Sequence, residues 1–205
     1  MTDPKSIIEF INIAEGLKRE LRHSWLSDGR QESVAEHVWS MSLLAMILFN
    51  EIKIEVNQLK VLKMIIIHDL VEIYTGDVPA HQINAQKQIE KQKSEENALK
   101  KLLARLRNKN TAKEIRDLWY EFEAKETNES KLAQACDKAE AVIQHNNANI
   151  KTFSQGDYDI NPYYKDYLFN FDKFIREFKN QIDVDAMQKI ESEGDISKVS
   201  REHRE

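Results

Sequence analysis

Apolar residues recur along this chain at the three- and four-residue spacing of amphipathic helices. The first expected helix begins at the pair Asp3-Pro4, with the aspartate as cap and the proline in the first turn, and it ends near Leu21. One face of this helix carries Ile7, Ile8, Ile11, Ala14 and Leu17. A second helix is expected to begin at Ser33-Val-Ala-Glu36, which matches a capping box.

The same spacing continues through the rest of the chain. It predicts a helix from Asn57 to the pair His68-Asp69, a short helix after this pair, a helix over residues 85–107 and a helix opened by a capping box at Thr111. It also predicts a helix that begins after Asn128 or Ser130 and reaches Ile143, a helix that follows a loop at Asn161-Pro162 and carries Leu168 to Phe178, and a last short helix over residues 183–190. We see no internal repeat and no strand-like alternation. We therefore expect an all-α, single-domain bundle of about eight or nine helices over residues 1–190. The polar residues 191–205 are expected to form a disordered tail.

Composition narrows the class of protein without identifying a function. The 205 residues include only 5 glycines and 3 prolines, which favours helix over sheet. A formal net charge of −5 lacks the basic excess of proteins that bind nucleic acid polymers. The longest aliphatic run, residues 64–67, is too short to cross a membrane. The single cysteine, Cys136, excludes an intrachain disulfide, so we expect a cytoplasmic protein.

Three of the expected helices each carry a side chain that can bind a metal. His37 lies on the second helix, His68 and Asp69 end the third, and Asp137 lies on a later one. Two imidazoles and two carboxylates form a mixed nitrogen and oxygen site, which suits Mn, Fe, Co, Ni or Zn better than Mg or Ca. The sequence therefore predicts one divalent transition metal, with its identity left open.

Most of these residue types also have simpler interpretations. A single histidine on a helix is more often a hydrogen-bonded structural residue than a ligand. We interpret Glu36 as a capping-box residue, Cys136 as a small core residue, and Trp39 as a packing residue. We do not expect ligands in His81, His145 or His203. What favours the metal interpretation over coincidence is the order His, His-Asp, Asp on three of the expected helices.

The pattern H…HD…D resembles that of the HD-domain superfamily of metal-dependent phosphohydrolases. Further segments resemble its 5′-deoxynucleotidase branch, and the resemblance covers about residues 5–180. These segments are Glu32-Ser-Val-Ala-Glu-His37, His68-Asp-Leu-Val-Glu72, Gly76-Asp-Val-Pro79, and Leu17-Lys-Arg19 with Arg22 and Trp25. The resemblance implies an enzyme that removes phosphate from deoxyribonucleoside 5′-monophosphates. It also makes a homodimer plausible, to which the apolar residues Phe171, Phe174 and Phe178 add a weak hint.

The resemblance also implies a role for each site residue. The implied metal ligands are His37, His68, Asp69 and Asp137. The acid/base carboxylate is Glu72 and the sugar contact is Asp77. Arg22 and Trp25 correspond to the contacts with phosphate or base, although Arg19 or His23 can take either place because the loop before His37 varies in length.

Elementary chemistry is consistent with these roles. Glu72 lies three residues after Asp69, so on a helix both side chains project from one side. A metal there acidifies water and polarises a phosphoryl group, while Glu72 transfers a proton. The guanidinium of Arg22 can form a bidentate contact with two phosphate oxygens. Asp77 can accept a hydrogen bond from a 3′-hydroxyl and disfavour a 2′-hydroxyl.

Three alternatives remain open. Another HD phosphohydrolase would act on nucleoside triphosphates, cyclic nucleotides or alarmones. However, Glu72 is followed by Ile73 and not by the aspartate of the alarmone hydrolases, and the Gly-Tyr-Pro signature of the cyclic-dinucleotide branch is missing. A non-catalytic metal- or nucleotide-binding module and a helical scaffold are the other two. No second metal cluster is evident in the sequence.

Overall fold

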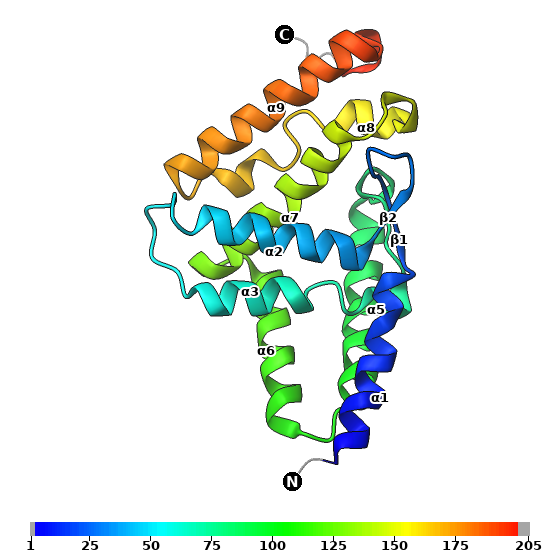
Figure 1. The fold of residues 1–205 in the computed structure, drawn as a ribbon, viewed down its shortest axis with the longest axis vertical. Helices are drawn as coiled ribbons and strands as arrows, with labels where there is room; N and C mark the ends of the chain where they lie inside the picture. Colours follow the sequence, from blue (N-terminus) through cyan, green and yellow to red (C-terminus); the bar gives the residue numbers. More distant parts are fainter. Residues whose placement is uncertain (1–2, 201–205) are drawn as a thin grey trace.

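The computed structural model describes residues 3–200 as a helical bundle with one small β hairpin (Figure 1). The all-α fold class is confirmed. The α helices are α1 (Pro4–Ala14), α2 (Val34–Leu48), α3 (Gln58–Ile67), α4 (Glu72–Thr75), α5 (Ala85–Leu103), α6 (Lys109–Ala124), α7 (Asn128–Asn147), α8 (Gln155–Ile160) and α9 (Lys173–Glu193). Short 3₁₀ helices are η1 (Glu15–Lys18), η2 (Ala80–Gln82), η3 (Ile150–Thr152), η4 (Asp166–Phe169) and η5 (Ile196–Lys198).

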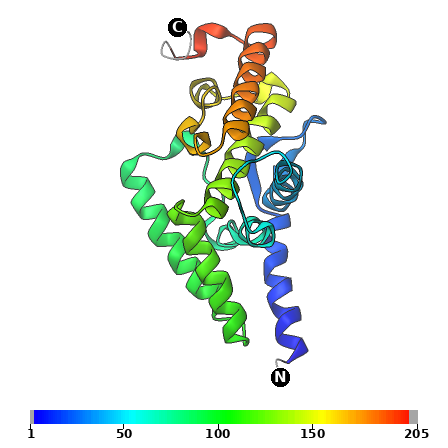
Figure 2. The same cartoon turned by 90° about the vertical axis from the view of Figure 1, so that its left-hand side faces the viewer.

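Helix α7 is the central element of the bundle. It contacts α2, α3, α6 and α9, whereas α5 and α6 contact each other and extend together away from α2 and α3 (Figures 1 and 2). Small buried residues on α7, Ala133, Ala135, Cys136 and Ala139, allow the neighbouring helices to approach its backbone closely. Cys136 is a buried core residue, as expected.

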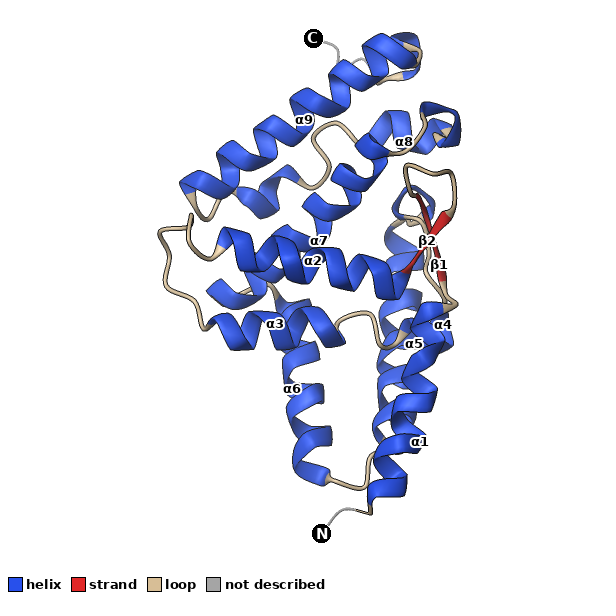
Figure 3. Cartoon of the chain, viewed as in Figure 1, coloured by secondary structure: helices blue, strands red, loops and turns tan. Residues whose placement is uncertain are grey.

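Strands β1 (Leu21–Trp25) and β2 (Gln31–Ser33) form an antiparallel hairpin in the region expected to end the first helix (Figure 3). The expectation that this helix reaches Leu21 is wrong, because α1 ends at Ala14. Gly29 has a φ of 89°, a conformation that favours glycine and permits the tight connection between the strands. A strand of five residues next to one of three is too short to show a clear alternation in the sequence.

Local capping chemistry sets the other helix starts. The capping box at Ser33 and the cap at Asn57 are confirmed. The expected box at Thr111 is wrong, because Asn108 accepts hydrogen bonds from two backbone amides and starts α6 earlier. The helix expected to carry Leu168 to Phe178 begins only after Asp172, whose carboxylate accepts from the amides of Phe174 and Ile175, and Leu168 lies in η4. The separate last helix expected at 183–190 is the second half of this same α9.

The end of the described chain is folded. Helix α9 runs to Glu193, η5 follows, and Val199 is 1% exposed because it packs against Tyr158 and Ile190. The expected disorder of residues 191–200 is therefore wrong, and residues 201–205 lie outside the described part. Within residues 3–200, none of the helices combines the length and the apolar character that a membrane crossing requires.

Candidate metal centre and substrate cavity

Helices α2, α3 and α7 pack against one another and bring the predicted ligands together. His37 lies just inside α2, whose start is set by the capping box at Ser33. His68 is the C-cap of α3, and Asp69 follows it where the backbone turns toward α4. Asp137 lies in the middle of α7. The four side chains therefore reach one place from three elements that are distant in sequence.

The ligand atoms are spaced as donors around a common ion would be. His68 Nε2 lies 3.0 Å from Asp69 Oδ2, and His37 Nε2 lies 3.3 Å from Asp137 Oδ1 and 4.0 Å from Asp69 Oδ2. Donors bound at about 2.0–2.2 Å to one cation lie roughly this far apart. One atom each from His37, His68 and Asp69 lies within 4.8 Å of the other two. Asp137 joins this group through its contact with His37.

Both histidine Nε2 atoms are buried without a hydrogen-bond partner of acceptable geometry. His37 is fully buried and His68 is 4% exposed. An unpaired polar atom inside a protein is costly, and a bound cation removes this cost for both imidazoles at once. Two imidazoles with two carboxylates are a suitable donor set for a divalent transition metal. The residues present therefore fit the metal that the sequence predicts.

The other ring nitrogens of the two histidines are held by the protein. His68 Nδ1 lies 2.8 Å from the carbonyl oxygen of Ile65, which only accepts, so Nδ1 carries the proton. His37 Nδ1 is hydrogen-bonded to the carboxylate of Glu140. Such contacts fix the orientation of a ligating imidazole and leave Nε2 for the metal. We did not single out Glu140 from the sequence, although its position three residues after Asp137 places both on one side of α7.

Electrostatics around His37 favour a positive charge at this place. Burial and Arg22 lower the pKa of His37, but the carboxylates of Glu140 and Asp137 outweigh them and raise it to about 9. A cation can supply this charge in place of the proton on Nε2. Since the metal and a proton compete for the same nitrogen, the metal affinity of such a site falls as the pH is lowered.

Glu72 is the first residue of α4 and lies beside the proposed ligands. It is 6% exposed, and its Oε2 atom has no hydrogen-bond partner. Burial, followed by repulsion from Asp69 and Asp77, raises the pKa of Glu72 well above its ordinary value. A carboxyl group with a raised pKa keeps its proton to a higher pH than an ordinary carboxyl group, which suits it to proton transfer.

A cavity of about 660 Å³ is lined by His68, Asp69, Glu72 and Asp137, whereas the fully buried His37 is not part of its lining. Its volume is typical of sites for small molecules. Cationic side chains line it beside the acidic ones: Arg22, Lys91 and Lys138. Lys138 Nζ lies 2.5 Å from Asp137 Oδ2, and Arg22 Nη1 lies 2.8 Å from Glu32 Oε2 and 3.5 Å from Glu140 Oε2. Lys138 was not expected at the site, although its position next to the candidate ligand Asp137 is a signal in the sequence.

Not all expected substrate contacts reach this cavity. Arg22 and Asp77 line it, and so does His23, whose backbone amide donates to Asp77 Oδ2 at 3.3 Å. Arg19 instead pairs with Glu15 at the surface, with 72% of its side chain exposed, and Trp25 packs against the ring of His23. The pairing of β1 with β2 is irregular between Leu21 and Trp25, so adjacent residues can face the same cavity.

Comparisons with known proteins agree with this geometry. The family model described as HD domain matches residues 14–180. A 5′-deoxynucleotidase HDDC2 from Dictyostelium discoideum is 34% identical over 144 residues, covering 67% of this chain and 74% of the relative. The 5′-deoxynucleotidase hdd1 from Schizosaccharomyces pombe is 32% identical over 144 residues, covering 68% of this chain and 70% of the relative.

A solved structure from Magnetospirillum magnetotacticum, a predicted metal-dependent phosphohydrolase, superimposes with a TM-score of 0.76 at 26% identity. The match covers 90% of this chain and 93% of that one. The family match spans the hairpin, the metal centre and the first part of α9, so it includes every residue of the metal centre and every cavity residue named above. The chain therefore belongs to the HD domain family and is a metal-dependent phosphohydrolase.

Proposed function

We propose that this enzyme is a phosphomonoesterase that hydrolyses nucleoside 5′-monophosphates, with deoxyribonucleotides preferred, to nucleoside and phosphate. The observation that carries this proposal is the pair of buried, unpartnered Nε2 atoms beside two carboxylates at the wall of a cavity that also holds Glu72. The names of the relatives, 5′-deoxynucleotidases, support the substrate class.

In this proposal His37, His68, Asp69 and Asp137 bind one divalent cation, which is Co, Mn, Ni, Fe or Zn. When bound, such a cation supplies Lewis-acid chemistry, acidifying water and polarising a phosphoryl oxygen. Lys138 neutralises part of the charge of Asp137, and Glu140 keeps His37 in the orientation that ligation requires. The chain's own contribution is thus to fix the donors and balance their charge.

Glu72 acts as the proton-transfer group. Burial raises its pKa and so favours the neutral form, which can deliver a proton to the departing sugar oxygen, whereas the ionised form can take one from the attacking water. Arg22 holds phosphate oxygens, because its guanidinium lies in the cavity lining and keeps its charge. Burial lowers the pKa of Arg22, but the carboxylates of Glu140 and Glu32 outweigh burial, so the pKa is raised.

Asp77 is the proposed contact to the sugar 3′-hydroxyl. It follows Gly76, whose φ of 74° turns the backbone after α4. Its position is held from two sides, because its amide donates to Glu20 Oε1 at 3.1 Å and its carboxylate accepts from the His23 amide. A carboxylate held this firmly can select a hydroxyl on one carbon and exclude one on the next.

We also propose a homodimer in the cytoplasm. The phenylalanines at 171, 174 and 178 are partly buried against the core and do not form the exposed face. Helix α2 instead exposes Trp39, Leu43, Met46 and Ile47, with side chains between 45% and 66% exposed at helical spacing. An exposed apolar stripe of this kind supports association with another copy.

Replacing the proton-transfer group tests the reaction. We expect Glu72→Gln to retain the metal and to lower phosphate release from deoxyribonucleoside 5′-monophosphates by about 10²–10⁴-fold, the usual contribution of a general acid or base. Glu90→Gln on exposed α5 is the control and should behave as wild type. Normal turnover by Glu72→Gln contradicts the assigned role. Wild-type protein that releases no phosphate with any divalent metal favours a non-catalytic binding module.

Replacing the partner of His37 tests the ligand set. Glu140→Gln keeps the shape of the side chain but weakens the hold on the imidazole, so we expect a loss of about 10–100-fold in metal affinity. Titration calorimetry of the chelator-treated protein measures this loss. Glu129→Gln, on the same helix and away from the centre, should leave the affinity unchanged. An unchanged affinity in Glu140→Gln contradicts the proposed orientation of His37.

Sugar selectivity tests the role of Asp77. Wild-type protein should hydrolyse deoxyribonucleotides faster than ribonucleotides, and Asp77→Asn should reduce this ratio at least tenfold, because a neutral amide binds the 3′-hydroxyl more weakly. The control Asp159→Asn removes a charge from the same cavity lining. Equal wild-type rates on both sugars would falsify the deoxyribose hypothesis.

Light scattering on the purified protein tests the dimer. The expected mass is twice that of the 24.0 kDa chain. Ile47→Asp should shift the protein toward monomer, because it places a charge in the apolar stripe of α2. Val184→Asp, at an exposed apolar position of α9, should not. A monomeric wild type at micromolar concentration contradicts the proposal.

A further inference from the structure

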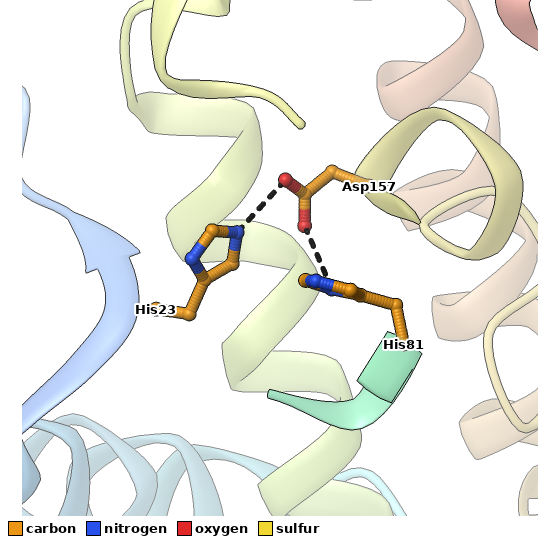
Figure 4. Close-up of side chains that lie close together, drawn as sticks. All are labelled: His23, His81 and Asp157. Carbon is orange, nitrogen blue, oxygen red and sulfur yellow. Dashed lines mark hydrogen bonds and ion pairs between the residues drawn. The ribbon is translucent and has the colours of Figure 1, made fainter. Parts of the chain in front are cut away.

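A second group of metal-competent side chains lies at another part of the cavity wall. His23 comes from β1, His81 from η2 and Asp157 from α8. One donor atom from each lies within 4.8 Å of the other two. His23 Nε2 is 3.0 Å from Asp157 Oδ2, and His81 Nδ1 is 4.0 Å from Asp157 Oδ1. Figure 4 shows the two rings facing different oxygens of the one carboxylate.

The fold makes room for His81 at this place. A Cβ atom built on Gly156 would lie 2.3 Å from His81 Cγ, so any larger residue would displace the imidazole. Within the described residues His81 makes no hydrogen bond, and its recorded polar contact is the long one to Asp157. Its side chain is nevertheless 18% exposed and lies at the cavity wall. One ring nitrogen of His81, Nδ1, therefore faces a buried carboxylate oxygen.

Asp157 is held as a ligating carboxylate is usually held. Its Oδ2 atom accepts hydrogen bonds from the amide and the hydroxyl of Ser154 at 2.7 and 2.8 Å, which fix the side chain. The residue is 2% exposed. Its Oδ1 atom faces His81 and His145 across gaps of 4.0 and 3.8 Å. Gaps of this length between donors leave space for an ion bound at about 2.0–2.2 Å to each.

His145 supports the group without offering a donor. Its Nε2 lies 3.0 Å from the carbonyl oxygen of His23 and its Nδ1 lies 3.1 Å from Asn161 Oδ1. Both nitrogens are therefore engaged. Burial lowers the pKa of His145 despite the opposing effect of Asp157, so the ring stays neutral and does not repel a cation.

We propose that His23, His81 and Asp157 form a second binding site for a divalent transition metal. Two imidazoles and one carboxylate suit Zn²⁺, Co²⁺ or Ni²⁺ and not the all-oxygen preference of Mg²⁺ or Ca²⁺. The site shares no residue with the centre at His37, His68, Asp69 and Asp137. The three protein ligands leave a coordination position, which faces the cavity that they line.

This site changes two expectations from the sequence. His81 was not expected to be a ligand, and a single metal was expected. The proposal concerns metal binding and does not depend on the proposed nucleotidase reaction. A metal here would join β1, η2 and α8, three segments that are otherwise connected by few hydrogen bonds around this part of the cavity.

Metal stoichiometry tests the proposal. After removal of metals by chelation, wild-type protein titrated with Zn²⁺ and measured by calorimetry and elemental analysis should bind two equivalents. His81→Gln should bind one, with the remaining affinity unchanged. The controls His203→Gln and Asp159→Asn should bind two. A wild type that binds one equivalent, or His81→Gln that still binds two, overturns the proposal and leaves the cluster as a hydrogen-bonded network only.

A second variant keeps the test independent of His81 itself. Gly156→Ala leaves all three ligands in the chain but displaces the His81 ring, so it should also bind one equivalent while its helical circular dichroism remains that of wild type. In Asp137→Ala, which removes a ligand of the other centre, one equivalent should remain and should disappear on adding His81→Gln. Retention of that equivalent in the double variant also overturns the proposal.

Discussion

The structure depends on the burial of acidic groups on α7 next to His37. Asp137 and Glu140 lie one helical turn apart in a helix that is buried on nearly all sides, and each contacts a different nitrogen of the same imidazole. Buried charges persist in proteins only when they are paired. The packing of α2 against α7 is therefore tied to the chemistry of the centre, because moving either helix would remove the imidazole of His37 from both carboxylates.

Charge balance extends this constraint to the hairpin and to the neighbouring lysines. Arg22 projects from β1 between Glu32 and Glu140, so it connects the hairpin to α7. Lys138 pairs with the other side of Asp137. The cavity thus contains both carboxylates that can hold a cation and cations that can hold phosphate, side by side. Such an arrangement binds a metal and an anionic substrate together, whereas either set of charges alone would repel one of them.

The cavity has two chemically distinct parts. One contains His68 and the carboxylates around Glu72, and the other contains His23, His81 and Asp157. Asp77 lies between them, since it is next to the turn after α4 and accepts from the backbone amide of His23. The hairpin is common to both parts, because Arg22 faces the carboxylates of the first and His23 faces Asp157 of the second.

Helical periodicity and short-range capping signals were enough to identify the all-α class, the start of α2 at Ser33 and the order of the ligand candidates, because these depend on residues within a few positions of each other. The hairpin was missed because two very short strands stabilise each other only as a pair. The folded end around Val199 was missed because the burial of Val199 depends on its packing against Tyr158 of α8 and Ile190 of α9.

The same distinction applies to the site. Motif, order and family resemblance were enough to propose His37, His68, Asp69, Asp137 and Glu72, because these signals lie within short stretches of the sequence. The contact of Glu140 with His37, the entry of His23 into the cavity in place of Trp25, and the meeting of His81 with Asp157 were decided by the tertiary structure. The contacts of Glu140 with His37 and of His81 with Asp157 join residues 103 and 76 positions apart, and the entry of His23 depends on a strand irregularity, so only packing determines which of many polar side chains meet.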